Sequence, residues 1–255
     1  MRAGLRAART RLRAGVGVAL VALATAAPGQ GRDADVVVFE VPDVRGLQLF
    51  LRDARGRGYG SLQAVESAVA ASGHRVVFAM NAGMYEPDRS PTGLFVQDGH
   101  PVAALNVQGR AQDARTPNFY LAPNGVFAVT AAGPVILSTS AFVRTPPRQV
   151  RLATQSGPLL LAGGVLVAPA VAAGTDAPAR RNKRNGICVN GARVLLVEAD
   201  AMTLHQFALH LRDVLECRDA LYMDGVISSV LDARTGRSDA VSPGNPLGPI
   251  IAYVE

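Results

Sequence analysis

Two charged residues of this chain adjoin strand-like apolar runs and are the first candidates for chemistry. Asp224 follows one such run, and the hydroxyl groups of Ser228 and Ser229 come shortly after it. Arg184 is the last cation of the segment 180–184 and leads directly into another run. An arginine whose direction is fixed by a strand presents a planar donor fork that suits a phosphate. Charge runs are usually solvated loops, and an Asp after a strand often starts a turn, so both patterns also fit ordinary surface structure.

Two further polar segments stand at predicted strand ends. Asn81, whose amide both donates and accepts hydrogen bonds, follows an apolar run. Gly83, two residues later, allows a ligand to approach the backbone. The second segment precedes a strand and carries Thr154, Gln155, Ser156 and Gly157. Either segment is also typical of a turn, and Ser156 lacks the G-x-S-x-G pattern of serine hydrolases.

Taken in this order, the segments resemble the phosphodiester glycosidase family, and most closely its exported bacterial branch. The resemblance spans Met80 to Ser229. It rests on six motifs in sequence order: Asn81–Tyr85; Pro91–Leu94 with Asp98-Gly99; Gln155–Pro158; Arg184–Gly186; Met202–Leu204; and Asp219–Gly225 with Ser228-Ser229.

The chain departs from the family pattern at two motifs. Ala82 replaces the first of two glycines that usually follow the asparagine. Val226 and Ile227 replace two glycines of the common D-G-G-G-S motif. Because Val and Ile resist a positive φ, this departure weakens the expectation of a backbone-amide nest and of a particular substrate.

The resemblance implies an exported hydrolase that cleaves a sugar 1-phosphodiester. The phosphomonoester leaving group is a good one, so the site needs a cation for the phosphate and a carboxylate that activates water or steadies an oxocarbenium-like transition state. We assign these roles to Arg184 and Asp224, with Asn81 as the third catalytic residue. The substrate-binding candidates are Gly83, Tyr85, Thr154, Gln155, Ser156, Gly157, Asn185, Gly225, Ser228 and Ser229.

Several alternatives stay open at this point. The same pocket suits a non-catalytic envelope protein that binds a sugar phosphate or glycan, or a phosphodiesterase that breaks the P–O bond. The sequence indicates no metal, although Asp224 could bind a divalent ion, and Asp88, Asp176 or Glu198 could supply a second carboxylate. With no Trp and only 13 aromatic residues, we expect a small pocket that Tyr85, Phe119, Tyr120 and Tyr222 could line, unless Phe119 and Tyr222 belong to the core.

The first 26 residues have the charge and hydrophobicity pattern of a signal peptide. Five arginines without an acidic residue precede the uncharged run 15–27, which contains the small-x-small pattern Ala24–Ala26. The run is shorter than the roughly 20 residues that a membrane span needs. We therefore expect residues 27–255 to be exported to the periplasm or beyond, without a stable membrane anchor.

Removal of the leader also changes the electrostatic interpretation. The whole chain has a net charge of +6, and five of these charges are leader arginines, which leaves +1. Nucleic-acid binding then loses its support, and a phosphodiester, as a small molecule or part of a glycan, is the expected partner. Cys188 and Cys217 could form a disulfide in an oxidising compartment, but their apolar surroundings favour two buried thiols.

The elements that position these residues predict one α+β (mixed α/β) domain, with a mixed β-sheet and a few packed helices. Helical spacing and capping residues predict helices over 61–72 and 204–215, the second with a T-x-x-Q capping box. The Asp98-Gly99 pair predicts a hairpin. The predicted strands are 35–41, 47–51, 75–80, 94–97, 101–105, 119–121, 126–129, 159–162, 164–167, 186–189, 194–198 and 220–223.

Overall fold

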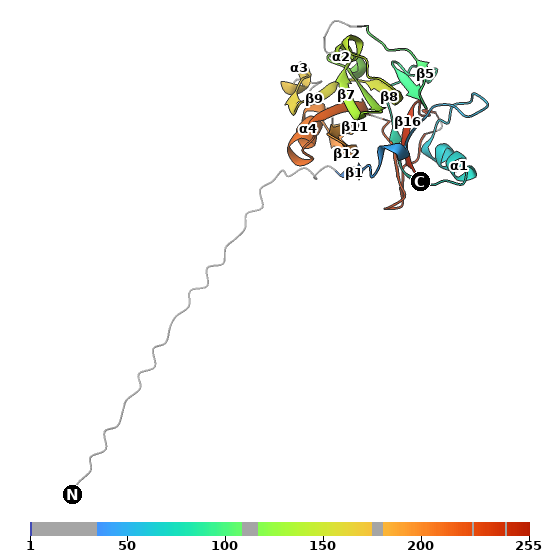
Figure 1. Ribbon diagram of the computed structural model, residues 1–255. Helices are drawn as coiled ribbons and strands as arrows, with labels where there is room; N and C mark the ends of the chain where they lie inside the picture. Colours follow the sequence, from blue (N-terminus) through green and yellow to red (C-terminus); the bar gives the residue numbers. More distant parts are fainter. Residues whose placement is uncertain (2–34, 109–116, 175–180, 226, 243) are drawn as a thin grey trace. The chain divides into compact units, whose positions relative to one another are not determined.

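The computed structural model describes Met1 and residues 35–108, 117–174, 181–225, 227–242 and 244–255. One compact unit spans Ala34–Glu255 (Figure 1). The predicted leader lies outside the described residues except for Met1, so its removal stays a prediction. Within the described ranges, no helix has the length and apolar character that crossing a bilayer requires.

Three β-sheets build this unit. The first has the strand order β1 (Val36–Glu40), β12 (Arg193–Met202), β11 (Asn182–Asn190), β13 (Asp219–Asp224), β9 (Leu159–Ala162), β10 (Val165–Leu166). The second has the order β15 (Arg237–Ser238), β14 (Val230–Asp232), β3 (Val76–Asn81), β16 (Ile250–Val254), β2 (Leu47–Phe50). The third has the order β5 (His100–Ala103), β4 (Phe95–Gln97), β8 (Val150–Ser156), β6 (Gly125–Thr130), β7 (Gly133–Ser138).

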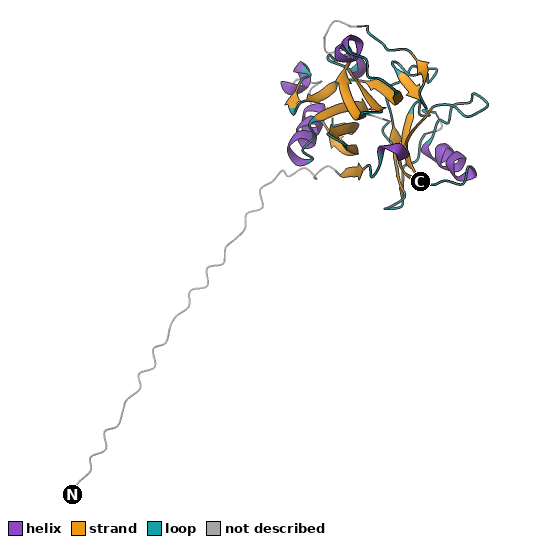
Figure 2. Ribbon diagram, viewed as in Figure 1, coloured by secondary structure: helices purple, strands orange, loops and turns teal. Residues whose placement is uncertain are grey.

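All strand pairs in the described part of the chain are antiparallel. The fold is therefore predominantly β with added helices, which agrees with the α+β class (Figure 2). The expectation of a mixed sheet was wrong. Strands joined by short connections can pair antiparallel without the helical crossover that parallel pairing requires.

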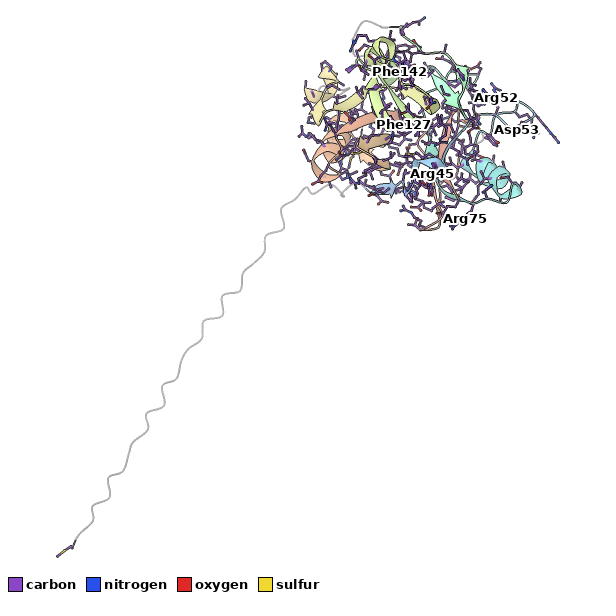
Figure 3. The ribbon with its side chains drawn as sticks, viewed as in Figure 1. Arg45, Arg52, Asp53, Arg75, Phe127 and Phe142 are labelled. Carbon is purple, nitrogen blue, oxygen red and sulfur yellow. A yellow bond between two sulfur atoms is a disulfide. The ribbon has the colours of Figure 1, made fainter. Side chains whose placement is uncertain are left out.

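The three sheets share one apolar core, and a helix covers the outer face of each. The shared core includes Phe78, Phe127 and Leu221, one from each sheet. Helix α1 (Leu62–Ala71) packs on the second sheet, Phe142 of α2 (Thr139–Arg144) on the third, and α3 (Pro169–Ala172) and α4 (Leu204–Leu209) on the first. Phe127 lies inside the molecule, whereas Arg52 and Arg75 lie at its periphery (Figure 3).

Local sequence signals at turns and caps are confirmed. Asp98 and Gly99 have φ values of 49° and 80° and join β4 to β5, as a two-residue hairpin turn requires. The Ser61 side chain caps α1 by accepting from the backbone N–H of Ala64. At α4, Thr203 and Gln206 form both bonds of the capping box.

Two expected elements were wrong in detail. The helix predicted over 204–215 is α-helical only to Leu209 and continues as a π-helix, His210–Val214. Residues Asn118–Tyr120 form a 3₁₀ turn instead of a strand. The strands β7, β8, β14, β15 and β16 were not predicted, and neither were the short helices α2 and α3. Among these, β8 and β16 matter most, because they lie next to the predicted site.

The expectation of two buried thiols was also wrong, because Cys188 and Cys217 form a disulfide. Cys188 is on β11, and Cys217 lies between the π-helix and β13. Their Cα atoms are 5.6 Å apart, and both residues are buried. The apolar neighbours that suggested free thiols are the packing around the bridge.

We predict that reduction of this disulfide lowers the free energy of unfolding by about 3 kcal/mol, since the bridge closes a loop of 29 residues in the unfolded chain. Urea titrations with and without dithiothreitol measure the difference. A double Cys188→Ala, Cys217→Ala variant is the control and should not respond to the reductant. Equal midpoints for the oxidised and reduced protein would contradict the prediction.

Candidate active site

The predicted site residues come together where strands of all three sheets end. Asn81 is the last residue of β3, Asp224 is the last residue of β13, and Thr154 lies near the end of β8. Asn185, on β11, pairs with Asp224 in the ladder. The second, first and third sheets thus each contribute to one location.

Three residues form a closed ring of hydrogen bonds. The Asn81 Nδ2 donates to Asp224 Oδ2 (3.2 Å). The Asp224 backbone N–H donates to Asn185 Oδ1 (2.7 Å), and Asn185 Nδ2 donates to the Asn81 carbonyl (2.9 Å). Asn81 and Asn185 are buried. The ring fixes the position of the Asp224 carboxylate relative to two different sheets.

The Asp224 carboxylate is partly exposed, and its two oxygens have different partners. Oδ1 accepts from the Gly225 N–H (2.6 Å), and Oδ2 accepts from Asn81. Desolvation by burial raises the pKa of Asp224 above its ordinary value, although the hydrogen bonds from Gly225 and Asn81 act in the opposite direction. Among the described residues, no cation forms an ion pair with this carboxylate.

Arg184 is fixed in place, as its position before a strand predicted. The side chain is buried, its Nε donates to the Met202 carbonyl (2.9 Å), and one terminal nitrogen donates to the Tyr222 hydroxyl (3.1 Å). That nitrogen would lie 3.3 Å from a Cβ placed on Gly225. Arg184 therefore lies against the start of the loop that follows Asp224.

The segment Thr154–Pro158 supports the site through packing and hydrogen bonds. The Thr154 Oγ1 accepts from the Gly83 N–H (3.2 Å), and Ser156 Oγ donates to the Met223 carbonyl (2.8 Å). A Cβ on Gly83 would collide with the Gln155 carbonyl oxygen and with Thr154. Glycine is therefore required here by close approach of β8, not by its φ.

Gln155 is fully engaged within the protein. Its Oε1 accepts from the backbone N–H groups of Leu94 and Asn106, and its Nε2 donates to the Asn106 carbonyl and the Thr139 hydroxyl. Its side chain thus joins β8 to the loops around it. Gly157 has a similar role, because a Cβ there would collide with the Phe119 carbonyl.

The aromatic candidates divide between core and site. Phe119 and Tyr222 are buried, whereas Tyr85 is half-buried. Burial raises the pKa of Tyr85 to about 12, and the nearby Asp224 adds to the increase. Burial also raises the pKa of Tyr222 to about 12, with Arg184 acting against and Asp224 acting with the increase. Asp224 is therefore within electrostatic range of both tyrosine hydroxyls.

Two backbone N–H groups of the loop after Asp224 form hydrogen bonds within the protein. The Ser228 N–H donates to the Gly225 carbonyl (2.7 Å), and the Ser229 N–H donates to Asn81 Oδ1 (2.9 Å). Neither Gly225 nor Ile227 is among the residues with a positive φ, and Val226 lies outside the described residues. The Ser228 hydroxyl is buried and has no hydrogen-bond partner among the described residues.

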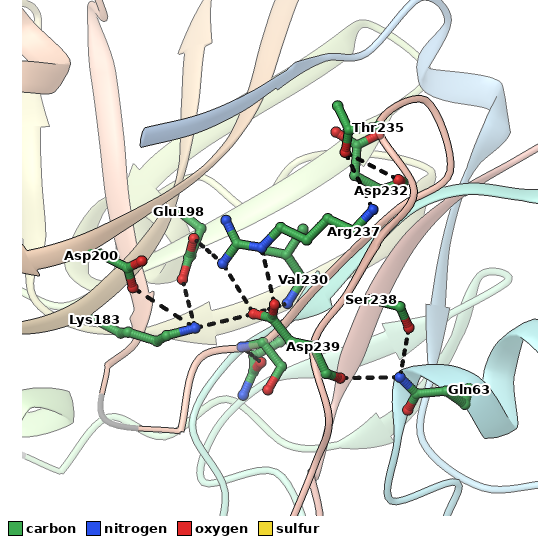
Figure 4. Close-up of polar contacts among 12 residues, drawn as sticks. Gln63, Lys183, Glu198, Asp200, Val230, Asp232, Thr235, Arg237, Ser238 and Asp239 are labelled. Carbon is green, nitrogen blue, oxygen red and sulfur yellow. Dashed lines mark hydrogen bonds and ion pairs between the residues drawn. The ribbon is translucent and has the colours of Figure 1, made fainter. Parts of the chain in front are cut away.

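A cluster of five charged side chains lies beside the site (Figure 4). Lys183 Nζ is 3.3 Å from Glu198, 3.8 Å from Asp200 and 3.1 Å from Asp239. Arg237 contacts Glu198 (3.1 Å) and Asp239 (3.0 Å). Asp239 also accepts from the Val230 N–H (3.2 Å), so the cluster holds the far end of the loop that begins at Gly225.

This cluster engages Glu198, one of the three candidates for a second carboxylate. A second candidate, Asp88, accepts hydrogen bonds from its own turn at Ser90, and the third, Asp176, lies outside the described residues. Among the residues that the structure describes, no three His, Cys, Asp or Glu side chains are grouped so that they could hold a metal ion.

Comparison with known proteins identifies the family. The sequence profile of the phosphodiester glycosidase family matches residues 74–250. This chain belongs to the phosphodiester glycosidase family. The chain is also 30% identical, over 192 residues, to the uncharacterized protein YigE of Escherichia coli K12, and the match covers 73% of this chain and 70% of that protein.

Two solved structures of family-like fold are similar to this chain. One is the zebrafish N-acetylglucosamine-1-phosphodiester alpha-N-acetylglucosaminidase catalytic domain, auto-inhibited by its pro-peptide. Its TM-score is 0.59 at 12% identity, covering 87% of this chain and 82% of the zebrafish chain. The other is a hypothetical protein from Synechocystis, with a TM-score of 0.53 at 16% identity, covering 87% of this chain and 59% of that one. At these identities the structures support the fold alone.

Sequence reasoning missed one side of the site. Tyr85 donates to the Pro246 carbonyl (3.2 Å), and a Cβ on Gly248 would collide with the Tyr85 ring. Pro246 and Gly248 therefore hold Tyr85 in place. The five Pro and Gly residues of the sequence segment 241–249, before an apolar run, were a usable signal for a loop.

We predict opposite stability effects for two buried serines of the site. Ser228→Ala removes a hydroxyl without a partner among the described residues and should leave the free energy of unfolding unchanged or slightly higher. Ser156→Ala removes the buried hydrogen bond to the Met223 carbonyl and should lower the free energy of unfolding by about 1–2 kcal/mol. Chemical denaturation measures both, and a larger loss for Ser228→Ala than for Ser156→Ala would contradict this description.

We also predict that Asp224→Asn gains stability relative to wild type as the pH rises. Burial raises the pKa of Asp224 in the native state above the ordinary 3.8. Below pH 3.8 Asp224 is protonated in both the native and the unfolded protein. Above pH 3.8 it ionises more readily in the unfolded protein, so the wild type loses stability as the pH rises, whereas Asp224→Asn does not. Melting temperatures from pH 3 to 7 measure the difference. Asp232→Asn is the control of opposite sign, because the hydrogen bonds from Arg234 lower the pKa of Asp232 and stabilise its charged form. A difference for Asp224→Asn that does not change with pH would contradict the prediction.

Proposed function

We propose that this protein is a hydrolase that cleaves the glycosyl–phosphate bond of a sugar 1-phosphodiester. Membership of the family supports hydrolase activity. The observation that carries the specific proposal is the Asp224 carboxylate, which is held by Asn81 and Gly225, is partly exposed and has no ion-pair partner among the described residues. Such a carboxylate retains the basicity that a catalytic base or charge stabiliser needs.

In this proposal Asp224 activates water or stabilises positive charge at C1 of the sugar. Water adds to C1 and gives one proton to Asp224 or to solvent, while the bond from C1 to the phosphate oxygen breaks and the bonding electrons leave with the phosphate. Arg184 holds the phosphate from the buried side. Asn81 and Asn185 position Asp224, and Tyr85 lies at the more exposed side of the site. Thr154, Ser228 and Ser229 remain proposed substrate contacts.

We further propose that the reaction takes place outside the cytoplasm. The leader pattern of residues 1–26 supports export, and so does the disulfide between Cys188 and Cys217, since disulfides persist mainly in oxidising compartments. Mass spectrometry of the protein recovered from the periplasm or the medium tests this proposal. A protein found only in the cytoplasm with its first 26 residues attached would contradict it.

We predict that the purified protein releases free sugar from at least one member of a panel of sugar 1-phosphodiesters, and that Asp224→Asn lowers kcat at least about 100-fold. Asp219→Asn is the matched control, because this carboxylate lies at the opposite end of the same strand. It should retain wild-type turnover. The acid limb of the kcat profile should lie above pH 3.8, in the direction of the raised pKa of Asp224.

Reactions in ¹⁸O-labelled water separate the alternatives. Label in the sugar indicates cleavage at C1, and label in the phosphate indicates a phosphodiesterase. If no substrate of the panel is hydrolysed but melting-temperature shifts show that one binds, the protein is a binder. Wild-type turnover by Asp224→Asn would exclude the proposed role of this residue.

A further inference from the structure

A cavity of about 380 Å³ lies next to the candidate active site. Its walls come from three loops: the residues 58–61 before α1, Arg89 in the loop between β3 and β4, and Val241, Ser242 and Pro246 before β16. Its volume falls in the range of small-ligand sites. None of these residues was among the predicted site residues.

Tyr85 connects this cavity to Asp224. The Tyr85 hydroxyl donates to the carbonyl of Pro246, which lines the cavity, and the ring packs against Gly248. Both Asp224 and Arg89 act electrostatically on the Tyr85 hydroxyl, Asp224 raising and Arg89 lowering its pKa. The Asp224 carboxylate and the Arg89 guanidinium are therefore both within electrostatic range of the Tyr85 hydroxyl.

Hydrogen bonds of the turn fix the backbone of Arg89, while its side chain is exposed to solvent. Its φ is +67°, an uncommon conformation for a residue with a long side chain. Hydrogen bonds from Arg89 N–H to the Glu86 carbonyl (2.7 Å) and from Glu86 N–H to the Ser90 carbonyl (2.8 Å) maintain the turn. Within the described part of the chain, the exposed Arg89 guanidinium forms no ion pair or hydrogen bond.

The proposed reaction creates a need for such a cation. A phosphodiester carries one negative charge. When the C1–O bond breaks, the electron pair remains on the phosphate oxygen, and the phosphomonoester product carries close to two charges at neutral pH. Arg184 is buried and already donates to Met202 and Tyr222. A second cation on the exposed side would stabilise the additional charge as it develops.

We propose that the cavity is the subsite for the phosphomonoester half of the substrate and that Arg89 is a second phosphate-binding residue, on the exposed side opposite Arg184. The alcohol part of this half occupies the space between residues 58–61 on one side and Val241, Ser242 and Pro246 on the other. The lining is rich in backbone and hydroxyl groups, including Ser61 and Ser242, which suits a polyol such as glycerol or a second sugar. The catalytic role of this subsite rests on the proposed function, but its ability to bind a phosphomonoester does not.

Isothermal titration calorimetry with glycerol 1-phosphate, and with glycerol as the uncharged control, tests the proposal on the purified protein. Arg89→Asn removes the charge, and asparagine tolerates the left-handed backbone at this position. We expect about tenfold weaker binding of glycerol 1-phosphate to Arg89→Asn, and a smaller loss for Arg89→Lys. Ser242→Phe, which fills the cavity without a change of charge, should also weaken binding.

Arg144→Ala is the matched control, because Arg144 is an exposed cation at the end of α2, outside the cavity lining. It should bind like wild type, and wild-type binding should weaken with added salt. Equal affinity of wild type and Arg89→Asn, or no binding by wild type, would overturn the proposal.

The two proposals can fail separately. Arg89-dependent binding without release of sugar from any diester would support the subsite proposal and contradict the hydrolase proposal. Turnover that depends on Asp224, with kcat and KM unchanged in Arg89→Asn, would support the hydrolase proposal and contradict the subsite proposal.

Discussion

The side-chain amide of Asn81 makes three hydrogen bonds at the junction of two sheets, and the geometry of the site depends on them. Its nitrogen donates to Asp224 and to the Ile227 carbonyl, and its oxygen accepts from the Ser229 N–H. Only a group that donates and accepts at once can do this. Because Asn81 is buried, a bond left unmade would cost about 1–3 kcal/mol. The ring completed by Asn185 then places the carboxylate.

The structural charges and the candidate catalytic charges have different kinds of partner. Lys183 and Arg184 are neighbours on β11, yet Lys183 joins the ion cluster with Glu198 and Asp239, while Arg184 contacts a carbonyl and a hydroxyl. In the cluster the carboxylates have cationic partners, which favour their charged forms. Asp224 has hydrogen bonds but no such partner among the described residues. Burial raises the pKa of both Asp224 and Glu198, but nearby cations partly offset it at Glu198, whereas only hydrogen bonds do so at Asp224.

The sequence predicted the positions of the site better than the sheets that create it. Asn81 and Asp224 were identifiable because each ends an apolar strand, and α4 because its capping box is a local pattern. The pairing of β3 with β14 and β16 is non-local, so no pattern within one strand specifies it. The disulfide likewise depends on β11 and β13 being neighbours. Arg89 was missed because its significance comes from a loop about 150 residues later.

The loop after Asp224 explains why one of the two family glycines, at the position of Ile227, can be replaced here. Glycines there would allow a nest of N–H groups to bind an anion. In this chain the N–H groups of Gly225, Ser228 and Ser229 donate to Asp224 Oδ1, the Gly225 carbonyl and Asn81 Oδ1. These three N–H groups are all used within the protein, so they are not free to bind an anion. Ile227 needs no glycine in its place, because its φ is not positive.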